Sequence, residues 1–398
     1  MITDHNEHLK ILQSLRVALV HDWLTGMRGG EKCLEVFCEI FPQADIYTLL
    51  HLKGSVSPII EGHPIQTSWI EHLPWVEQKY RNYLPLFPRA IESFFLKGYD
   101  LILSSSHCVA KGIRFDPNTL HISYLHTPMR YVWDMYDIYF GKESDAGWTA
   151  RAIMPAIRPF LQKWDVRSND RVHYFLANSE HVHRRIKRIY NRQAEVIPPP
   201  VDTQTFEIFP KPHNYYLLVS ALAPYKRVDL AVRAFNRMGK PLILVGTGPL
   251  AASLKKESGR NISWLGWQSS EELKKLYGEC LAFIFPGEED AGITPLEAQA
   301  SGRPVIAFGK GGALETIVPL EDYLEGKRDF FSGIFFPEQT EEALIEAVGK
   351  LETQAYRLNP EKLRAHALTF DRQVFKERMI QKISEKIRLH PQHSKIKQ

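Results

Sequence analysis

Two series of short apolar segments, separated by stretches of helical length, constrain the fold of this chain more than any other feature. The first half contains RVALVHD, ADIYTLL, YDLILSSS, HISYLHT and HYFLANSE, and the second contains YYLLVSAL, PLILVGTG, NISWLGW, LAFIFPG and PVIAFG. Near-continuous apolar strands that alternate with helices are typical of parallel sheets covered by helices on both faces. The sequence therefore predicts an α/β chain with two doubly wound units.

A proline-rich segment between the two series predicts where the first unit ends. VIPPPVDTQTFEIFPKPHN carries prolines at 198, 199, 200, 210 and 212, which continue neither a helix nor a central strand. A length of 398 residues also fits two domains. We predict an N-terminal domain over 1–200, a C-terminal domain over 201–370, and a helix over 371–390 that crosses back onto the first domain.

Composition and charge exclude several classes of protein. With 44% hydrophobic and 24% charged residues the chain is globular, and a formal net charge of +4 does not predict a nucleic-acid partner. The longest apolar runs are shorter than the roughly 18 residues of a membrane span, and MITDHNEHLK is too polar for a signal peptide, which predicts a cytoplasmic protein. The four scattered cysteines predict buried thiols.

The segment LAFIFPGEEDAGITPLEAQA places a helix start directly after a strand. Its pattern predicts Thr294 as the N-cap, Pro295 at the first helical position and Glu297 as the partner of a capping box. The free N–H groups and the positive dipole end of such a helix favour an anion, and Gly292 allows a ligand to approach the backbone. Two interpretations of Glu297 stay open at this point, a helix cap and a member of a phosphate site.

Glycines and basic residues follow the first strand of each half. Gly29 and Gly30 lie between a strand and a helix, where they form either a phosphate or sugar loop or a tight turn. Lys226 and Arg227 follow SALAPY and either neutralise a diphosphate or lie in solvent.

Two more segments carry patterns that are found in ligand sites. His126 and Arg130 stand in YLHTPMRYVWD near the end of a predicted strand. A single histidine is usually structural, so the case for a ligand role of His126 rests on this position. PLILVGTGPLAASL matches a dinucleotide fingerprint, but Pro249 removes a backbone donor and the next strand does not end in an acidic residue. A nicotinamide site is therefore not predicted.

In combination these segments resemble a known family. NSEHVHRRIKRIYNRQAEVIPPPVD, SALAPYKRVDLAVRAF, VGTGPL, LGWQSSEEL and EDAGITPLEAQASGRPVIAFGKGGALETI are similar, in this order, to the retaining, metal-independent enzymes of glycosyltransferase family 4. The resemblance covers about residues 16–385, and YLHTPMRYVWD with PYKRVDLA is most similar to bacterial mannosyltransferases of surface-polysaccharide assembly. It implies the GT-B architecture, in which two Rossmann-like domains face each other across a cleft.

The resemblance also implies an activity and its partners. A hexose would pass from a nucleoside-diphosphate sugar, GDP-mannose on resemblance alone, to a hydroxyl of a glycan or lipid-linked acceptor, without a metal or other cofactor. Three alternatives stay open: a UDP-sugar donor, a catalytically silent sugar-nucleotide-binding module, and a sugar-nucleotide epimerase of the same fold. Acceptor-dependent release of the nucleoside diphosphate distinguishes transfer from silent binding and epimerisation.

Individual residues take roles from the resemblance. The catalytic set would be His126 near the transferred sugar, Lys226 at the leaving diphosphate and Glu289 beside the donor sugar. The donor-binding set would be Arg227, Gly266, Trp267, Gly292, Ile293, Thr294, Leu296 and Glu297. The acceptor and phosphate loop would be Gly29, Gly30 and Arg130, and Gly311 with Gly312 would form a second glycine turn. No residue is assigned to a metal.

Three positions depart from the family pattern SRLxPxK and its glutamate loop. Ala221 stands where relatives place an arginine, so either Arg227 or another arginine compensates or donor binding is weaker. Asp290 and Ala291 replace a glycine and an aromatic residue, and Asp290 either selects sugar hydroxyls or faces solvent. Charge that develops on the diphosphate would be met by Lys226 and the helix dipole, with front-face attack and the leaving phosphate accepting the proton.

Basic residues in the first half predict contact with an anionic membrane, at the inner face of the cytoplasmic membrane. HVHRRIKRIYNRQ collects five of them without an acid, and LPWVEQKYRNYLPLFPRAIESFFLKG interleaves them with aromatic residues. The alternative is a solvated helix face followed by an ordinary buried helix.

Overall fold

The computed structural model describes residues 9–141 and 147–390, which divide into two units. Unit 1 comprises the described residues up to Pro199 together with those from Gln373 onward, and unit 2 comprises Pro200–Arg372. The predicted domain limits, after residues 200 and 370, lie within two residues of these divisions.

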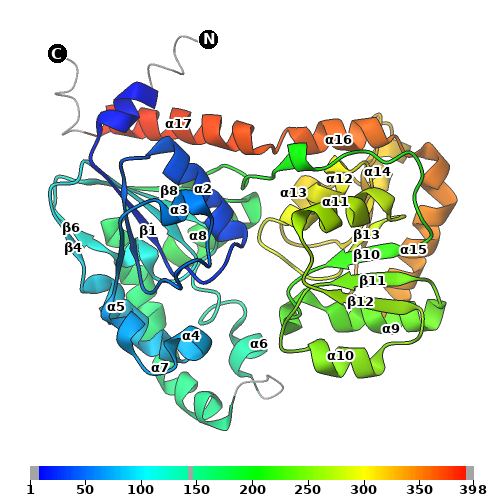
Figure 1. Ribbon diagram of the computed structural model, residues 1–398, viewed down its shortest axis with the longest axis horizontal. Coiled ribbons are helices and arrows are strands. Elements are labelled where there is room, and N and C mark those ends of the chain that lie inside the picture. The colour runs from blue at the N-terminus through cyan, green and yellow to red at the C-terminus, as the bar shows by residue number, and fades with distance from the viewer. Residues whose placement is uncertain (1–8, 142–146, 391–398) are drawn as a thin grey trace. The chain divides into compact units, whose positions relative to one another are not determined.

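Unit 1 is built on a seven-stranded parallel sheet with the order β3-β2-β1-β5-β7-β8-β9 (Figure 1). Its strands are β1 (Val17–His21), β2 (Asp45–Thr48), β3 (Ile65–Thr67), β5 (Leu101–Ser106), β7 (Leu120–Leu125), β8 (Tyr174–Ala177) and β9 (Ala194–Val196). The five strands predicted from apolar runs all form. The edge strands β3 and β9 are only three residues long and carry no such run, and Val196 of β9 shows that the predicted linker began too early.

Helices cover this sheet and contribute residues to three hydrophobic clusters. They are α2 (Gly29–Ile40), α3 (Pro58–Glu61), α4 (Val76–Lys79), α5 (Phe87–Glu92), α6 (Tyr136–Phe140), α7 (Trp148–Arg167), α8 (Glu180–Tyr190) and α17 (Arg372–Leu389), with a short parallel pair β4 (Phe95–Leu96) and β6 (Arg114–Phe115). Chain-terminal α17 packs beside α2 (Figure 1), because Phe375 stacks on Phe37 at 5.9 Å and the Lys376 ammonium lies 3.0 Å from the Glu39 carboxylate. This contact ties the end of the chain to the core of unit 1.

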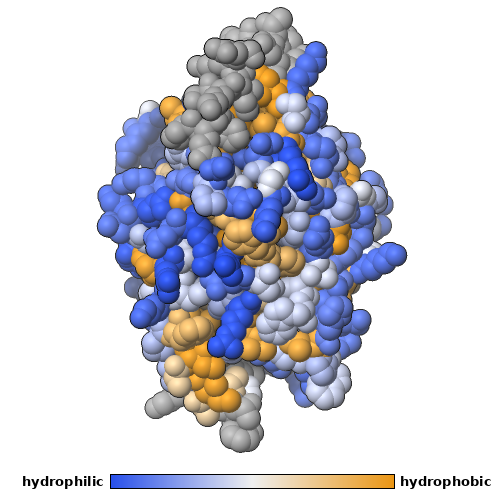
Figure 2. All heavy atoms as spheres, turned by 90° about the vertical axis from the view of Figure 1, so that its left-hand side faces the viewer, coloured by the Kyte–Doolittle hydropathy of each residue, from blue (hydrophilic) through white to orange (hydrophobic). Residues whose placement is uncertain are grey.

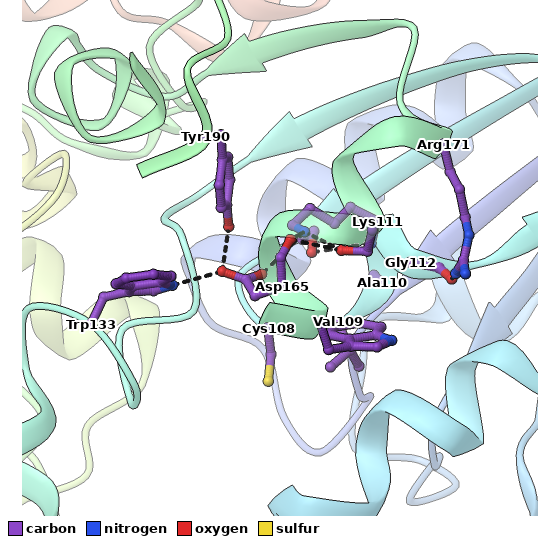
Figure 3. A network of polar contacts seen from close by, with 12 residues as sticks. Cys108, Val109, Ala110, Lys111, Gly112, Trp133, Asp165, Arg171 and Tyr190 are labelled. Atoms are coloured by element: carbon purple, nitrogen blue, oxygen red, sulfur yellow. Dashed lines mark hydrogen bonds and ion pairs between the residues drawn. The ribbon is translucent and has the colours of Figure 1, made fainter. Parts of the chain in front are cut away.

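A buried ion pair joins the segment after β5 to α7. Lys111 is fully buried, and its Nζ lies 3.1 Å from Asp165 Oδ1 and 2.6 Å from the Asp165 carbonyl oxygen. Figure 3 shows Trp133 and Tyr190 pointing at the same carboxylate, to which their N–H and O–H donate at 2.8 and 2.9 Å. Burial lowers the pKa of Lys111, although the charge of Asp165 opposes this shift. The network locks four segments of unit 1 together.

Unit 2 contains a six-stranded parallel sheet with the order β12-β11-β10-β13-β14-β15, the 3-2-1-4-5-6 order of a Rossmann sheet. Its strands are β10 (Tyr216–Val219), β11 (Leu242–Val245), β12 (Ile262–Gly266), β13 (Phe283–Phe285), β14 (Val305–Phe308) and β15 (Gly333–Phe336). The five predicted strands form, and β15 is an addition. The helices are α9 (Val228–Met238), α10 (Ala251–Glu257), α11 (Ser270–Glu279), α12 (Ile293–Ala300), α13 (Ala313–Thr316), α14 (Leu320–Leu324), α15 (Glu341–Gln354) and α16 (Pro360–Leu368).

Two further expectations concern the cysteines and the membrane. All four cysteines are buried free thiols, as predicted. Within residues 9–141 and 147–390, no helix is both long enough and apolar enough to cross a bilayer.

Candidate functional site

The strand order of unit 2 places its predicted site residues at one edge of the sheet. β10 and β13 are neighbours, and the chain leaves them toward helices on opposite sides, which is the switch point where open α/β sheets bind ligands. The two following loops touch, because a Cβ on Gly287 would lie 3.0 Å from both the Cα of Lys226 and the carbonyl oxygen of Tyr225. Glycine at this position allows that close approach.

Lys226 and Glu289 form an ion pair across these loops. Their side chains are only 16% and 21% exposed, so Lys226 does not lie on a solvated surface. The Lys226 ammonium also sits over the ring of Tyr225, 5.2 Å from its centroid. Two of the three predicted catalytic residues therefore meet at the switch point.

A glycine turn after β14 packs against the backbone of the Glu289 loop. Gly311 has a φ of +72°, and a Cβ there would lie 2.3 Å from the Glu289 carbonyl oxygen. The Gly312 N–H donates to the same oxygen at 2.8 Å, and a Cβ on Gly312 would lie 2.6 Å from the Cα of Ala291. This turn positions the Glu289 loop by backbone contact, which explains its glycines without a ligand.

The predicted start of the helix after this loop is wrong by two residues. Gly292 is the N-cap of α12, with a φ of +74° that favours glycine, and Ile293 is the first helical residue. Thr294 lies inside the first turn, and its side chain does not cap the helix. The sequence pattern misled because a left-handed glycine starts this helix without a side-chain cap.

Glu297 has a partner that the capping interpretation does not provide. The carboxylate is buried, and Oε2 accepts a hydrogen bond from the Tyr277 hydroxyl at 2.9 Å. Tyr277 is fully buried on α11, where burial and the nearby Glu297 charge raise the pKa of its phenol well above its usual range. Tyr277 therefore acts as a fixed donor that orients Glu297, and the capping interpretation is wrong.

The remaining donor-side residues occupy different environments. Arg227, at a φ of +52°, donates to Asp229 at 3.1 Å and to Gln339 at 3.2 Å, so its side chain is already hydrogen-bonded at the start of α9.

Gly266 ends β12 with a φ of +70°, and Trp267 beside it is 76% exposed. Leu296 packs in the core. Asp290 is buried, so of its two interpretations the one in which it faces solvent is wrong. The side chain of Ile293 is partly buried in the same turn of α12.

Backbone packing explains the glycines of the dinucleotide-like segment. A Cβ on Gly246 would lie 1.9 Å from the Ser220 carbonyl oxygen, and one on Gly248 would lie 2.6 Å from the Leu222 carbonyl oxygen. The loops after β10 and β11 are therefore in direct contact. This contact accounts for the pattern that resembled a dinucleotide fingerprint.

Unit 1 has its own switch point between the neighbouring strands β1 and β5. Asp22 follows β1 and is fully buried, and its carboxylate accepts four backbone N–H groups from the segment after β5 at 2.6 to 3.0 Å. The His107 ring nitrogen Nδ1 lies 3.0 Å from the same carboxylate. Burial raises the pKa of Asp22, but His107 and its hydrogen bonds outweigh burial and hold the pKa below its usual range. Asp22 is therefore an ionised anchor.

The predicted glycine loop is in part the first turn of a helix. Gly29 and Gly30 are the first two residues of α2, with Arg28 as the N-cap, so their placement in a loop is wrong. A Cβ on Gly30 would lie 3.3 Å from Cε1 of His21 and 3.6 Å from Nε2 of His126. Glycine here lets the helix approach two histidines.

His126 lies where the sequence predicted it, directly after β7. Its Nε2 is 2.8 Å from the Ser105 hydroxyl, and only 9% of the residue is exposed. Burial lowers the pKa of His126 well below its usual range, and the charges of His107, His21 and Arg130 act in the same direction. His126 is therefore neutral at neutral pH, and Arg130 acts on it electrostatically.

Sequence reasoning missed most of this second cluster. His21 and Asp22 follow one apolar run, and His107 follows another, but the relation between them depends on β1 lying beside β5. The available signal was a histidine at the end of one buried strand, His21, and another directly after a second, His107. It became informative only with the strand order.

Unit 2 is similar to a known protein family. Residues 202–367 match the family model described as Glycosyl transferases group 1. This stretch is similar to a group 1 glycosyltransferase domain. It contains the unit 2 switch point with Lys226, Glu289 and α12.

Curated relatives and solved structures extend the comparison. The chain is 30% identical over 145 residues to O-antigen chain mannosyltransferase C of Escherichia coli, covering 35% of this chain and 37% of that protein. It is 28% identical over 205 residues to a GDP-mannose-dependent α-(1-6)-phosphatidylinositol monomannoside mannosyltransferase of Mycobacterium tuberculosis, covering 44% and 51%. The aligned part is thus about a third to a half of each relative's length.

Structural similarity covers both units. HepE of Anabaena in complex with UDP has a TM-score of 0.67 at 15% identity, over 93% of this chain and 100% of that one. Sucrose-phosphate synthase of Thermosynechococcus elongatus has a TM-score of 0.68 at 16% identity, over 93% and 98%. The chain around the group 1 domain therefore has the GT-B fold, as predicted.

Proposed function

We propose that this chain is a glycosyltransferase that moves a hexose from a nucleoside-diphosphate sugar to a hydroxyl of a glycan or lipid-linked acceptor. The observation that carries the proposal is the partly buried Lys226–Glu289 pair beside the start of α12, at the switch point of a group 1 domain. Lysine is a point charge suited to a diphosphate, and the N–H groups of a helix start attract the same anion. Glu289 is the carboxylate available beside the donor sugar.

In the proposed reaction the acceptor oxygen forms a bond to the anomeric carbon while the bond from that carbon to the diphosphate breaks. The electron pair stays on the leaving phosphate, which also accepts the proton of the acceptor hydroxyl. Attack from the same face gives retention. Lys226 and the α12 dipole stabilise the developing negative charge, so no metal ion is assigned a role.

Mannose from GDP-mannose is the proposed donor sugar. Support comes from the relatives in E. coli and M. tuberculosis, whose names describe mannosyltransferases, one of them GDP-mannose-dependent. A UDP-sugar is the competing donor, because the similar HepE structures hold UDP or UDP-glucose. A catalytically silent nucleotide-binding module is the competing function, because Ala221 stands where relatives place an arginine.

A thermal-shift panel without added metal tests the donor site. GDP or GDP-mannose at about 100 times its dissociation constant should stabilise the chain by roughly 2.7 kcal/mol, and UDP and ADP should stabilise it less. Glu297→Gln keeps the shape and the Tyr277 contact but removes a charged hydrogen-bond acceptor, which should weaken nucleotide binding about tenfold or more. Glu279→Gln, whose carboxylate pairs with His213, is the matched control and should bind normally.

The outcomes of this panel separate the alternatives. A larger thermal shift with UDP than with GDP would indicate that the donor is a UDP-sugar and not GDP-mannose. Binding that remains normal in Glu297→Gln would contradict the assignment of Glu297. Nucleotide binding without acceptor-dependent release of nucleoside diphosphate would identify a silent module.

We propose a different helix for the membrane contact. In α8, Arg185 and Arg188 both bind Asp134, so these two arginines are already paired. The outward side of α7 instead carries Ile153 and Phe160, which are 54% and 55% exposed. Figure 2 shows hydrophobic side chains gathered at the lower end of the face turned to the viewer, at the height of α7 in Figure 1.

Charge complementarity supports an anionic partner for α7. The exposed basic residues of α7 are Arg151, Lys163 and Arg167, and the described side chains of α7 include only one acid, the buried Asp165. Apolar side chains interspersed with lysine and arginine favour the interface of an anionic bilayer. We therefore place the membrane contact of the proposed enzyme on α7.

Flotation with liposomes tests this placement. The chain should float with vesicles of 70% phosphatidylcholine and 30% phosphatidylglycerol, and much less with pure phosphatidylcholine. Ile153→Asp with Phe160→Asp should abolish flotation, because two charges would enter the interface. Leu324→Asp, at a residue of unit 2 that is 54% exposed, is the matched control. The proposal would be contradicted if the chain floated equally with both lipid mixtures. It would also be contradicted if the α7 variant floated as well as the wild type.

A further inference from the structure

Apart from His126, the polar side chains clustered at the unit 1 switch point have no part in the donor half of the proposed reaction. This histidine cluster comes from the carboxyl ends of β1, β5 and β7 and the first turn of α2, and comprises His21, Asp22, Glu31, Ser105, His107 and His126. The side chain of His107 is 20% exposed, whereas those of His21, Asp22 and Glu31 are 0%, 0% and 4% exposed. His107 is therefore the member best placed to meet a ligand.

Asp22 fixes the orientation of the His107 ring. An ionised carboxylate at 3.0 Å requires Nδ1 to carry the hydrogen, and in the neutral ring this leaves Nε2 as an acceptor. The edge of the ring also packs on Trp23, with centroids 4.4 Å apart. Two independent contacts thus hold the ring in one pose.

A purely structural role does not account for this arrangement. The Asp22 carboxylate already accepts four backbone N–H groups, so it is satisfied without the imidazole. Among the described residues, none forms a hydrogen bond with either ring nitrogen of the fully buried His21, whose Nε2 is 3.7 Å from Glu31. Buried polar atoms are normally paired, so unpaired ring nitrogens indicate a polar group that the chain does not supply.

The chemistry of the cluster favours a hydroxyl over a phosphate. Asp22 and Glu31 are acidic, and an Nε2 without hydrogen accepts a hydrogen bond rather than donating one. His107 lies beside His126, with ring centroids 6.3 Å apart. A sugar hydroxyl can donate to Nε2, whereas a phosphate oxygen cannot.

We propose that His107 accepts a hydrogen bond from the acceptor hydroxyl, with Asp22 holding its ring in the required tautomer. The inference rests on the proposed function and adds to it the group that receives the acceptor. His107 would then be a residue that binds and orients the acceptor, and Asp22 a positioning residue that acts through it.

Two substitutions of His107 separate this role from a structural one. The amide of His107→Asn can replace Nδ1–H toward Asp22 but leaves nothing at the position of Nε2. The longer side chain of His107→Gln brings an amide oxygen to the position of Nε2. If His107 binds the acceptor, transfer activity should fall more in the Asn variant. If His107 only supports Asp22, transfer activity should fall more in the Gln variant.

The assay uses octyl α-D-mannopyranoside as the acceptor probe and release of nucleoside diphosphate as the readout. His107→Asn should raise the KM for the probe at least tenfold, His107→Gln should recover part of this loss, and the nucleotide-induced thermal shift should be that of the wild type. His63→Asn is the matched control, because its ring binds the Ala44 carbonyl beyond the opposite, amino end of β2. In wild-type protein with ¹⁵N-labelled histidine, the probe should move the His107 ring signals.

Each contrary outcome has a clear meaning. A wild-type KM in His107→Asn, a loss confined to the donor KM, or ring signals that stay fixed would overturn the assignment. Absence of any nucleotide-induced shift in the wild type would instead reject the proposed function. Ring signals that move in a chain without transfer activity would reject transfer and retain the hydroxyl site.

Discussion

Replacement of Lys226 by alanine should lower kcat for hexose transfer by about 10²- to 10³-fold at saturating donor, the usual effect of removing one preorganised group that stabilises transition-state charge. The reason is local, since the ammonium is only 16% exposed and sits beside Glu289, whose negative charge would be left facing the diphosphate. Steady-state release of nucleoside diphosphate measures the loss. The donor KM should change much less than kcat, because the charge develops in the transition state.

Two companion variants make this result specific. Lys274→Ala removes a lysine of the same unit whose ammonium pairs with Glu207, and it should keep full activity. Lys226→Arg should recover part of kcat, since it restores the charge with a different shape. Full turnover in Lys226→Ala would show that the leaving diphosphate is neutralised elsewhere.

The second large effect concerns stability. Lys111→Met should lower the free energy of unfolding of unit 1 by about 3–5 kcal/mol, because removal of one partner leaves a buried charge uncompensated. Asp165 would keep the donors Trp133 and Tyr190 but lose its counter-charge (Figure 3). Amide hydrogen exchange in β5 under EX2 conditions measures the loss within unit 1 itself.

A more exposed ion pair provides the comparison. Lys376→Met breaks the contact with Glu39, whose side chains are 23% and 26% exposed, and it should cost at most about 1 kcal/mol. The double variant Lys111→Met with Asp165→Leu should recover part of the loss, since both charges are then gone. Equal protection of β5 in the Lys111 and Lys376 variants would mean that Asp165 finds another counter-charge.

The parallel strands were predictable from sequence because they are buried on both faces. β1 and β14 are completely buried, and they contain the unbroken apolar runs VALV and VIAF. The edge strands β3 and β9 are three residues long and partly exposed, so they carry no such run. Their formation depends on a neighbouring strand, which the local sequence does not reveal.

The same distinction applies to the candidate site. Lys226 and Glu289 were expected together through the resemblance, and the sheet order brings their loops into contact. Glu297 was ambiguous because its buried partner, Tyr277, lies on another helix. His107 and Asp22 were not found, since their contact requires the pairing of β1 with β5. Residues joined by tertiary pairing leave little local signal.

The contacts between the loops of unit 2 limit how its specificity can be changed. Gly246, Gly248, Gly311 and Gly312 each bring a backbone segment too close to its neighbour for a side chain. Insertions or larger residues in any one loop would displace the next, so the floor of the site tolerates little redesign. A change of donor base is better sought at Trp267, which is 76% exposed and lies beside the open turn at Gly266. Libraries confined to that rim should retain folded variants more often than libraries in the glycine loops.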